Sequence, residues 1–382
     1  MRPWSPHRYK ADGIQRGVPE HTLTAAIAAY ERVLSVSEEL TPVLTLRHLA
    51  KLTGVSYAFQ RAVVSRTKSP YFTFEIDKRG PGRRRAANRR LIAVPDHRLR
   101  TVQSWICEAI LKHIPAASHS FAYHPGGSVI RCAQRHCGCR WLMKMDIADF
   151  FQSIREHHVY RVFRSLGYGR LISFEMARLC TMQPVRHEER DVGLVRRRAG
   201  IAAYGPRYPG HLPMGAPTSP MISNLFMREF DRAIARICAA QGVIYSRYAD
   251  DIVMSTDDPT FNREAAVELV RECRQMVRRH GMRPQEAKVS IVPPGARKVV
   301  LGIVVNDREP KLSKEFKSRL RQHYYYIKKY GMLEHATRRH FFSVPALQRH
   351  LEGLMAYAAQ VEPAYAVRLR SIHNSFAWPR IP

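Results

Sequence analysis

The tetrapeptide YADD at residues 248–251 places two adjacent carboxylates, Asp250 and Asp251, between two apolar runs. Residues 243–245 and 252–254 each favour a β-strand, so the pattern predicts a hairpin with both carboxylates at its turn. Neighbouring like charges repel, and a cation relieves that repulsion. Mg²⁺ prefers such oxygen ligands. We therefore expect a metal site at the hairpin tip; the alternative is a polar turn without a ligand, because Asp is common in turns.

The charge balance indicates a polyanionic partner. The 382 residues include 62 Lys and Arg against 32 Asp and Glu, which gives a net charge of +30. Such an excess is typical of proteins that bind nucleic acid. No apolar run is long enough to span a bilayer, and the N-terminus MRPWSPHRYKADG lacks the apolar core of a signal peptide. We expect a cytoplasmic protein without membrane contact.

The seven cysteines favour reduced thiols over a disulfide scaffold. One group, Cys132, His136, Cys137 and Cys139, has the residue types of a zinc site. However, the spacing of Cys137 and Cys139 is not the usual two-residue spacing, and no second Cys/His pair follows. Ordinary thiols are the favoured interpretation.

A third carboxylate, Asp146, lies upstream in WLMKMDIADFFQSI. Residues 141–145 predict a strand that ends at Asp146, and a helix is expected to begin near Asp149. A carboxylate at the end of a buried strand is costly unless it binds something. If its strand neighbours the YADD hairpin, three carboxylates could hold two Mg²⁺ ions for phosphoryl displacement. The alternative for Asp146 is a helix cap.

The run LPMGAPTSPMISNLF at residues 212–226 predicts an irregular loop that leads into a helix. Pro213, Gly215 and Pro217 oppose regular helix, and a helix should begin near Ser219 with Pro220 in its first turn. A glycine turn allows close approach of a ligand to the backbone, although a purely structural loop fits equally well. Elsewhere we expect helices at residues 21–65 and 99–114, a strand at 71–76, and a basic helical C-terminal part.

Three of these segments, MDIADFF, LPMGAPTSP and YADD, resemble motifs A, B and C of reverse transcriptases in order and spacing. CAQRH at residues 132–136 is similar to the NAxxH element of retron enzymes, and VLG at 300–302 is similar to their VTG element. The chain thus resembles the retron reverse transcriptases over about residues 45–370.

This resemblance implies an α/β (α+β) right-hand polymerase, with fingers, a palm whose antiparallel sheet carries YADD, and a helical thumb. We expect a helical extension at 1–65, fingers with the start of the palm at 66–145, palm at 146–305 and a basic thumb at 306–382. An arginine-rich insertion at 185–211 is expected to contact RNA or a partner; a surface loop is the alternative.

The resemblance also assigns the chemistry. Asp146, Asp250 and Asp251, with the main chain of Ile147, are the expected ligands of two Mg²⁺ ions, for which Mn²⁺ could substitute. Lys288 resembles the motif D lysine that protonates or stabilises the departing pyrophosphate. A solvated surface lysine is the alternative for Lys288.

Deoxynucleotide binding is expected at residues that match the fingers, motif A and motif B. Phe151 resembles the steric gate that excludes a 2′-hydroxyl, and a core aromatic residue is the alternative. Arg90 resembles the arginine that grips the triphosphate, with help from Lys78. Met214 and Gly215 belong to motif B, where Met214 replaces the usual Gln.

Contacts with RNA or primer are expected along the insertion, the primer grip and the thumb. In the thumb, charge and aromatic surface alternate as in nucleic-acid grooves, although some of its tyrosines must pack the core. The expected contacts are His136, Arg196, Arg197, Arg198, Leu301, Gly302, Lys317, Arg321, Tyr325 and Lys328.

The resemblance implies an RNA-directed DNA polymerase that copies part of a structured noncoding RNA into single-stranded DNA. Its expected partners are that RNA, the RNA–DNA product, deoxynucleotides and an effector protein, with anti-phage defence as the expected role. Three alternatives remain: another bacterial defence reverse transcriptase with different priming, a group II intron enzyme, and a non-catalytic RNA-binding scaffold. Little chain follows the thumb to supply the further domains of an intron enzyme.

Overall fold

The computed structural model describes residues 5–77, 89–184 and 210–379. The chain forms two compact units that interleave along the sequence. Unit 1 comprises Met1–Pro125, Ile147–Arg232 and Met276–Pro284, and unit 2 comprises Gly126–Asp146, Ala233–Gln275 and Gln285–Pro382. Both units mix helices with antiparallel strands, which confirms the predicted α/β class. The four expected domains, with the three boundaries between them, remain predictions.

Unit 1 contains the N-terminal helices and a two-stranded hairpin. Local capping explains several helix starts: Thr45 and Ser56 accept hydrogen bonds from the first turns of α3 and α4, and Asp96 accepts one from the Leu99 N–H of α5. Its elements are α1 Pro6–Gln15, α2 Glu20–Leu34, α3 Leu46–Thr53, α4 Tyr57–Val64, β1 Tyr71–Asp77, β2 Arg89–Pro95, α5 His97–Ala109, the 3₁₀ helix η2 Leu111–His113, α7 Phe150–Ser153, α8 Glu156–Ser165, α9 Arg170–Cys180 and β6 Arg283–Pro284.

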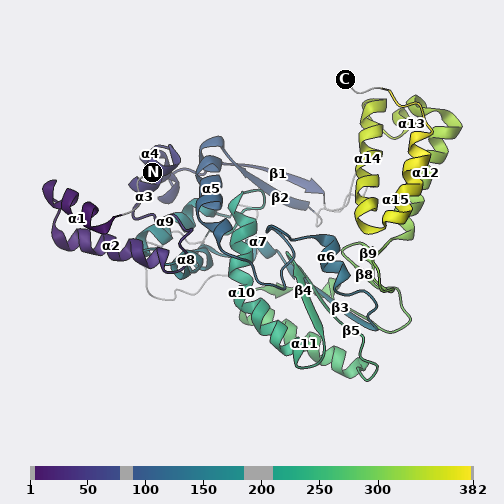
Figure 1. Ribbon diagram of the computed structural model, residues 1–382, viewed down its shortest axis with the longest axis horizontal. Helices are drawn as coiled ribbons and strands as arrows, with labels where there is room; N and C mark the ends of the chain where they lie inside the picture. The colour runs from purple at the N-terminus through teal and green to yellow at the C-terminus, as the bar shows by residue number, and fades with distance from the viewer. Residues whose placement is uncertain (1–4, 78–88, 185–209, 380–382) are drawn as a thin grey trace. The chain divides into compact units, whose positions relative to one another are not determined.

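A five-stranded antiparallel sheet carries the YADD segment. Its order is β4-β5-β3-β6, and β7 also pairs with β3. Figure 1 shows β4, β5 and β3 side by side. The strands are β3 Trp141–Ala148, β4 Ile244–Tyr248, β5 Asp251–Thr256 and β7 Ser290–Val292, and the adjoining helices are α6 Val129–Gln134, α10 Thr218–Ala239, α11 Arg263–Arg279 and the 3₁₀ helix η3 Glu286–Lys288.

The structure corrects the expectation that a strand ends at Asp146. β3 continues to Ala148 because Ile147 and Ala148 pair with Pro284 and Arg283 of β6. Asp146 therefore lies within a strand and caps no helix. Asp149, at the N-terminus of α7, makes no capping hydrogen bond with its side chain; it has a left-handed φ of 48° and pairs with Arg283 at 3.1 Å.

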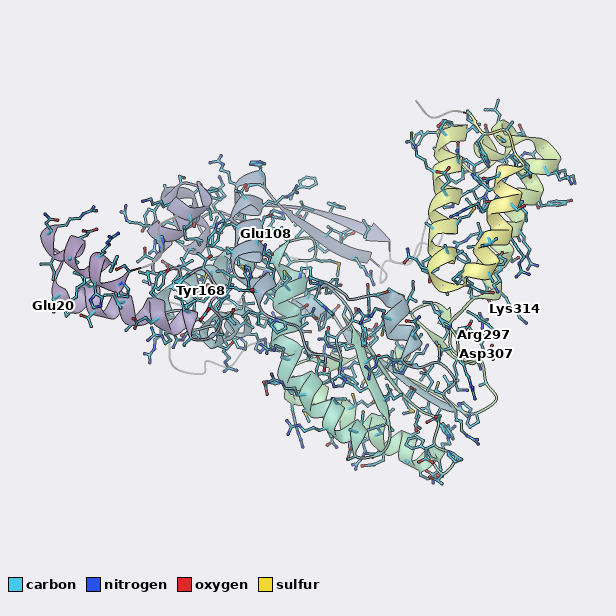
Figure 2. The ribbon with its side chains drawn as sticks, in the orientation of Figure 1. Glu20, Glu108, Tyr168, Arg297, Asp307 and Lys314 are labelled. Atoms are coloured by element: carbon cyan, nitrogen blue, oxygen red, sulfur yellow. The ribbon has the colours of Figure 1, made fainter. Side chains whose placement is uncertain are left out.

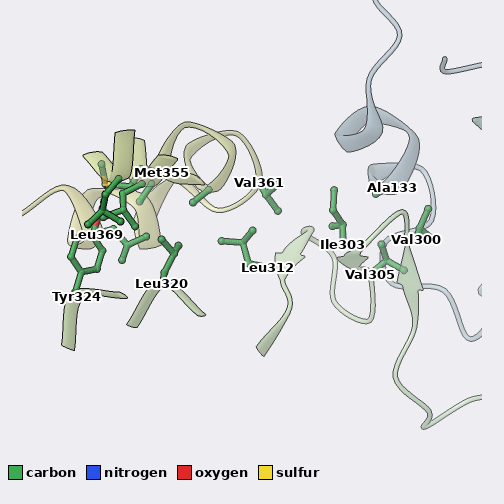
Figure 3. Packing of buried hydrophobic residues seen from close by; sticks show 14 of the residues in the cluster. Ala133, Val300, Ile303, Val305, Leu312, Leu320, Tyr324, Met355, Val361 and Leu369 are labelled. Atoms are coloured by element: carbon green, nitrogen blue, oxygen red, sulfur yellow. Dashed lines mark hydrogen bonds between the residues drawn. The ribbon is translucent and has the colours of Figure 1, made fainter. Parts of the chain in front are cut away.

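The C-terminal part of unit 2 is a helical bundle joined to short strands. The strands are β8 Val299–Val300, β9 Ile303–Val304 and β10 Lys311–Leu312, followed by α12 Lys314–Tyr330, α13 Met332–Arg338, α14 Val344–Val361 and α15 Pro363–Asn374. One buried cluster runs from Ala133 and Val300 to Leu320 and Leu369 (Figure 3). Arg297 and Glu315 form a bidentate ion pair where the strands meet α12, near the labelled Lys314 of Figure 2. No helix among the described residues is long and apolar enough to cross a membrane.

A buried ion network fixes one part of unit 1. Glu156 is 1% exposed and accepts hydrogen bonds from Arg66 at 2.6 Å and from Arg178 at 3.0 Å. Arg66 also donates to Thr181 Oγ1 at 2.7 Å. Removing one partner of a buried ion pair leaves the other charges uncompensated. Glu156 is therefore expected to be far more important for stability than any exposed carboxylate.

We predict that Glu156→Gln lowers the free energy of unfolding by about 3 kcal/mol, because two buried guanidinium groups lose their counter-charge. Chemical denaturation of the full chain measures the change. Glu229→Gln is the matched control, since Glu229 is 74% exposed in its pair with Arg232 and should cost less than about 1 kcal/mol. Equal effects of the two substitutions would contradict the prediction.

Candidate active site

The YADD segment forms a tight turn between β4 and β5. Tyr248 pairs with Asp251, so only Ala249 and Asp250 lie in the turn. Ala249 has a φ of 56°, a conformation that non-glycine residues rarely adopt. The fully buried Arg247 donates a hydrogen bond to the Ala249 carbonyl at 2.9 Å and holds this turn. Asp250 is thus at the tip, as predicted, whereas Asp251 is the first residue of β5.

The strand register brings Asp146 to the hairpin. Asp146 of β3 is directly opposite Asp251 of β5, at the end of the register between these strands. Directly opposed residues in an antiparallel pair project to the same face with Cβ atoms about 5 Å apart. Asp146 is 5% exposed, and Asp250 and Asp251 are partly buried. All three carboxylates belong to unit 2.

The carboxylates repel one another. Burial raises the pKa of Asp251 to about 6, and the charges of Asp250 and Asp146 contribute to the rise. The nearby ammonium groups of Lys288 and Lys144 act in the opposite direction. A site with this excess of negative charge favours a cation.

Lys288 reaches this site from η3. Its Nζ lies 2.5 Å from Oδ2 of Asp146, and the Gln285 N–H donates to the Asp146 carbonyl at 2.7 Å. Partial burial lowers the pKa of Lys288, but the hydrogen bond to Asp146 and the charges of Asp250 and Asp251 outweigh it and raise the pKa overall. Lys288 is therefore a charged ammonium beside the carboxylates.

The three carboxylates fit a hard divalent cation such as Mg²⁺, because they offer oxygen ligands and repel one another when no cation is bound. An ammonium already contacts Asp146 as a cation would. Among the described residues, no three side chains of His, Cys, Asp or Glu are grouped closely enough to coordinate one ion as they stand. Binding of one ion by all three carboxylates would thus require their side chains to move closer together. Ile147, the other expected ligand, follows Asp146 in β3, and its side chain is buried.

The expected nucleotide-binding residues that the structure describes belong to unit 1. Phe151 is in α7, partly buried, with its ring 6.1 Å from Tyr123 and 5.5 Å from Phe150. Arg90 is exposed on β2, opposite Ile76 of β1. Lys78 lies outside the described residues.

The motif B loop contacts the strand that carries Arg90. The Ala93 N–H donates to the Met214 carbonyl at 2.7 Å. Gly215 has a φ of +117°, and a Cβ there would lie 3.0 Å from the Ala93 carbonyl oxygen. No other residue type fits this approach without strain. The loop then enters α10 at Thr218, close to the predicted Ser219, with Pro220 in the first turn as expected.

His136 does not have the environment expected of an RNA contact. Its side chain is 1% exposed and lies 2.6 Å from the hydroxyls of both Ser246 in β4 and Ser255 in β5. Burial, with a smaller effect of Arg135, lowers its pKa to about 3, so the imidazole is neutral. His136 therefore links the two strands of the YADD hairpin through these serines. Sequence reasoning missed this because the two serines, like Arg247, show no recognisable motif.

The residues expected to contact the primer and the RNA differ in their exposure and in their partners. Leu301 and Gly302 form the turn between β8 and β9, with φ values of 49° and 84°. Lys317 is engaged by Glu362 at 2.8 Å, so its charge is already paired. Of the expected contacts on α12, Arg321, Tyr325 and Lys328 are exposed.

Of the three consecutive tyrosines in α12, Tyr324 packs inside the bundle and Tyr325 is 58% exposed. This agrees with the expectation that some of them form the thumb core. Arg196, Arg197 and Arg198 lie outside the described residues.

Comparison with known proteins adds a family context. The family model described as reverse transcriptase (RNA-dependent DNA polymerase) matches residues 76–305. The chain is 32% identical to the Retron Mx65 reverse transcriptase of Myxococcus xanthus, over 78% of this chain and 63% of that protein. It is 25% identical to the Retron Ec86 reverse transcriptase of Escherichia coli, over 85% of this chain and 92% of that protein. The match thus spans less than two thirds of the Mx65 protein but nearly all of the Ec86 protein.

We predict that Asp251 makes the stability of the metal-free protein depend on pH. Because its folded-state pKa of about 6 exceeds the value of 3.8 for an exposed aspartate, ionising it destabilises the fold. This destabilisation is absent below about pH 4, grows as the pH rises, and levels off once the pH exceeds the folded-state value of about 6, where it reaches about 3 kcal/mol.

Thermal or urea unfolding of wild type and Asp251→Asn, both stripped of divalent ions, tests this. The advantage of the Asn variant should widen from pH 4 to pH 7. Asp257→Asn, which alters an exposed aspartate just after β5, should show no such trend. A constant difference between wild type and Asp251→Asn across this range would refute the assignment.

Proposed function

The chain belongs to the reverse transcriptase family, as a retron-type member, and we propose that it binds a cognate structured RNA and copies part of it into single-stranded DNA. One observation carries this proposal: the register that sets Asp146 opposite Asp251, with Asp250 in the adjoining turn. Three carboxylates on one sheet edge are suited to nucleotidyl transfer.

We propose that Asp146, Asp250 and Asp251, with the Ile147 carbonyl, hold two Mg²⁺ ions, for which Mn²⁺ could substitute. Bound there, such ions would activate the primer hydroxyl and neutralise charge on the triphosphate. Lys288 is placed beside the same carboxylates, and its ammonium can donate a proton to the departing pyrophosphate. Arg90 and Lys78 would bind the triphosphate as charged donors.

Phe151 and the motif B loop would select and position the nucleotide. A ring below the sugar excludes a 2′-hydroxyl by its volume. Met214 offers no amide to the sugar, so its contribution is limited to packing and to the backbone bond with Ala93. The close approach at Gly215 fixes the loop relative to β2.

We propose RNA and primer contacts for those expected residues whose side chains are exposed or lie in the β8–β9 turn. Arg321, Tyr325 and Lys328 present charge and a stacking surface on α12. Leu301 and Gly302 would support the primer end from the β8–β9 turn. The effector protein and the anti-phage role are proposed on the family resemblance, and the cytoplasmic location is proposed because no apolar run of the sequence is long enough to span a bilayer.

We predict that Asp250→Asn lowers DNA synthesis by at least about 10³-fold. The reason is that the proposed metal site loses one carboxylate ligand, and the metal ions stabilise the charge of the transition state. Incorporation of deoxythymidine on poly(rA)·oligo(dT) with Mg²⁺ measures the rate without the native RNA. Asp257→Asn, an exposed aspartate just after the same hairpin, is the matched control and should retain activity. A wild-type rate no higher than that of Asp250→Asn would favour a non-catalytic RNA-binding scaffold.

The nucleic acid that co-purifies with the wild-type protein from cells carrying its native locus distinguishes the type of enzyme. A DNA joined covalently to RNA is expected for a retron product. A free DNA without an RNA branch would instead favour another bacterial defence reverse transcriptase with different priming.

We predict that Phe151→Ala raises the use of ribonucleotides relative to deoxynucleotides by about 10- to 100-fold, because the clash with the 2′-hydroxyl disappears. The ratio of kcat/KM values for the two nucleotides measures discrimination. Phe150→Leu is the control: Phe150 is 5% exposed, so this change should lower stability and leave the ratio unchanged. Unchanged discrimination in Phe151→Ala would assign Phe151 to the core instead.

A further inference from the structure

The side chain of Lys288 occupies the carboxylate that the proposed metal site needs. Its Nζ is 2.5 Å from Oδ2 of Asp146, whose side chain is 6% exposed, whereas the Lys288 side chain is 54% exposed. Asp250 and Asp251 also act electrostatically on this ammonium. The half-exposed Lys288 therefore forms an ion pair with the nearly buried carboxylate of Asp146.

Charge balance explains this contact. Three carboxylates at one sheet edge repel each other strongly in a partly buried environment. A single ammonium group provides a counter-charge when no metal ion is bound. An ammonium and a divalent ion on the same carboxylate oxygen repel each other and compete for its lone pairs, so each weakens the binding of the other.

We propose that Lys288 is the internal counter-ion of the metal-free site and competes directly with the metal ion for Asp146. This inference rests on the proposed function, because it takes Asp146 to be a metal ligand. Lys288 must leave Asp146 before the ion binds there. The same movement frees its ammonium for the leaving group, so the proton donor becomes available only once the metal is loaded.

The placement of Lys288 allows this exchange. It is the last residue of the three-residue η3, and its flexible four-carbon stem can move the ammonium without moving the backbone. The backbone beside it stays anchored, because the Gln285 N–H donates to the Asp146 carbonyl at 2.7 Å. The Lys288 ammonium can therefore exchange while η3 remains in place.

Lys144 offers a matched comparison. It lies two residues before Asp146 on β3, on the same face of the strand. It also acts electrostatically on Asp251. Its Nζ, however, donates to the Val299 carbonyl at 3.1 Å. Removing Lys144 changes the local field, whereas removing Lys288 changes the field and also frees the carboxylate.

Metal affinity of the full-length protein, measured without nucleic acid, tests the proposal. Mn²⁺ binding can be followed by electron paramagnetic resonance and Mg²⁺ binding by calorimetry. We expect Lys288→Met to bind Mn²⁺ about tenfold more tightly than wild type, and Lys144→Met to gain no more than about threefold. Equal affinities of wild type and Lys288→Met, or equal gains in the two lysine variants, would overturn direct competition.

A double-mutant cycle locates the competition. In the Asp146→Asn background, Lys288→Met should no longer increase affinity, because the contested carboxylate is absent. Thermal unfolding adds a second readout: without metal, Lys288→Met should melt below wild type, and saturating Mn²⁺ should close the gap. A gap that persists at saturating Mn²⁺ would indicate a purely structural lysine.

The outcomes separate this inference from the polymerase function. If Lys288→Met leaves Mn²⁺ affinity unchanged while Asp250→Asn abolishes DNA synthesis, the counter-ion role is wrong and the polymerase function stands. If Lys288→Met binds Mn²⁺ more tightly but wild type makes no DNA, the counter-ion role stands and the proposed function fails.

Discussion

The antiparallel register between β3 and β5 is the constraint on which the candidate site depends. It sets Asp146 opposite Asp251, and a shift by one residue would turn Asp146 to the other face of the sheet. Other contacts hold the strands on either side of this pair: β6 pairs with the end of β3, His136 contacts both hairpin strands through Ser246 and Ser255, and buried Arg247 holds the hairpin turn. These contacts keep the three carboxylates close together although their charges repel one another.

Local patterns in the sequence predicted the local parts of this site. The two apolar runs that flank YADD predicted the hairpin, and Pro220 after a proline- and glycine-rich loop predicted the start of α10. Non-local pairing was beyond the same reasoning. Nothing in residues 141–149 indicates that β6 would carry the strand past Asp146, and nothing near His136 indicates two serine partners more than one hundred residues away. Nor does the sequence indicate that Lys317, expected to contact RNA from the thumb pattern, pairs with Glu362 farther along the chain.

The distribution of residues between the two units has a mechanistic meaning. The three carboxylates and Lys288 all belong to unit 2, together with the cluster that extends into the helical bundle. Their geometry is therefore set within one compact body. Phe151, Arg90 and the motif B loop belong to unit 1. Under the proposed function, the residues for chemistry and those for nucleotide selection would thus belong to different units.

The close approach of Gly215 to the Ala93 carbonyl links two stretches that are far apart in sequence. A side chain at position 215 would push on the strand that carries Arg90, and a displaced strand would leave the Met214 carbonyl without its donor. A change in either stretch therefore has to be accommodated by the other. Chimeras that exchange the β1–β2 hairpin between distant relatives should succeed only when the loop that carries Met214 and Gly215 comes from the same parent.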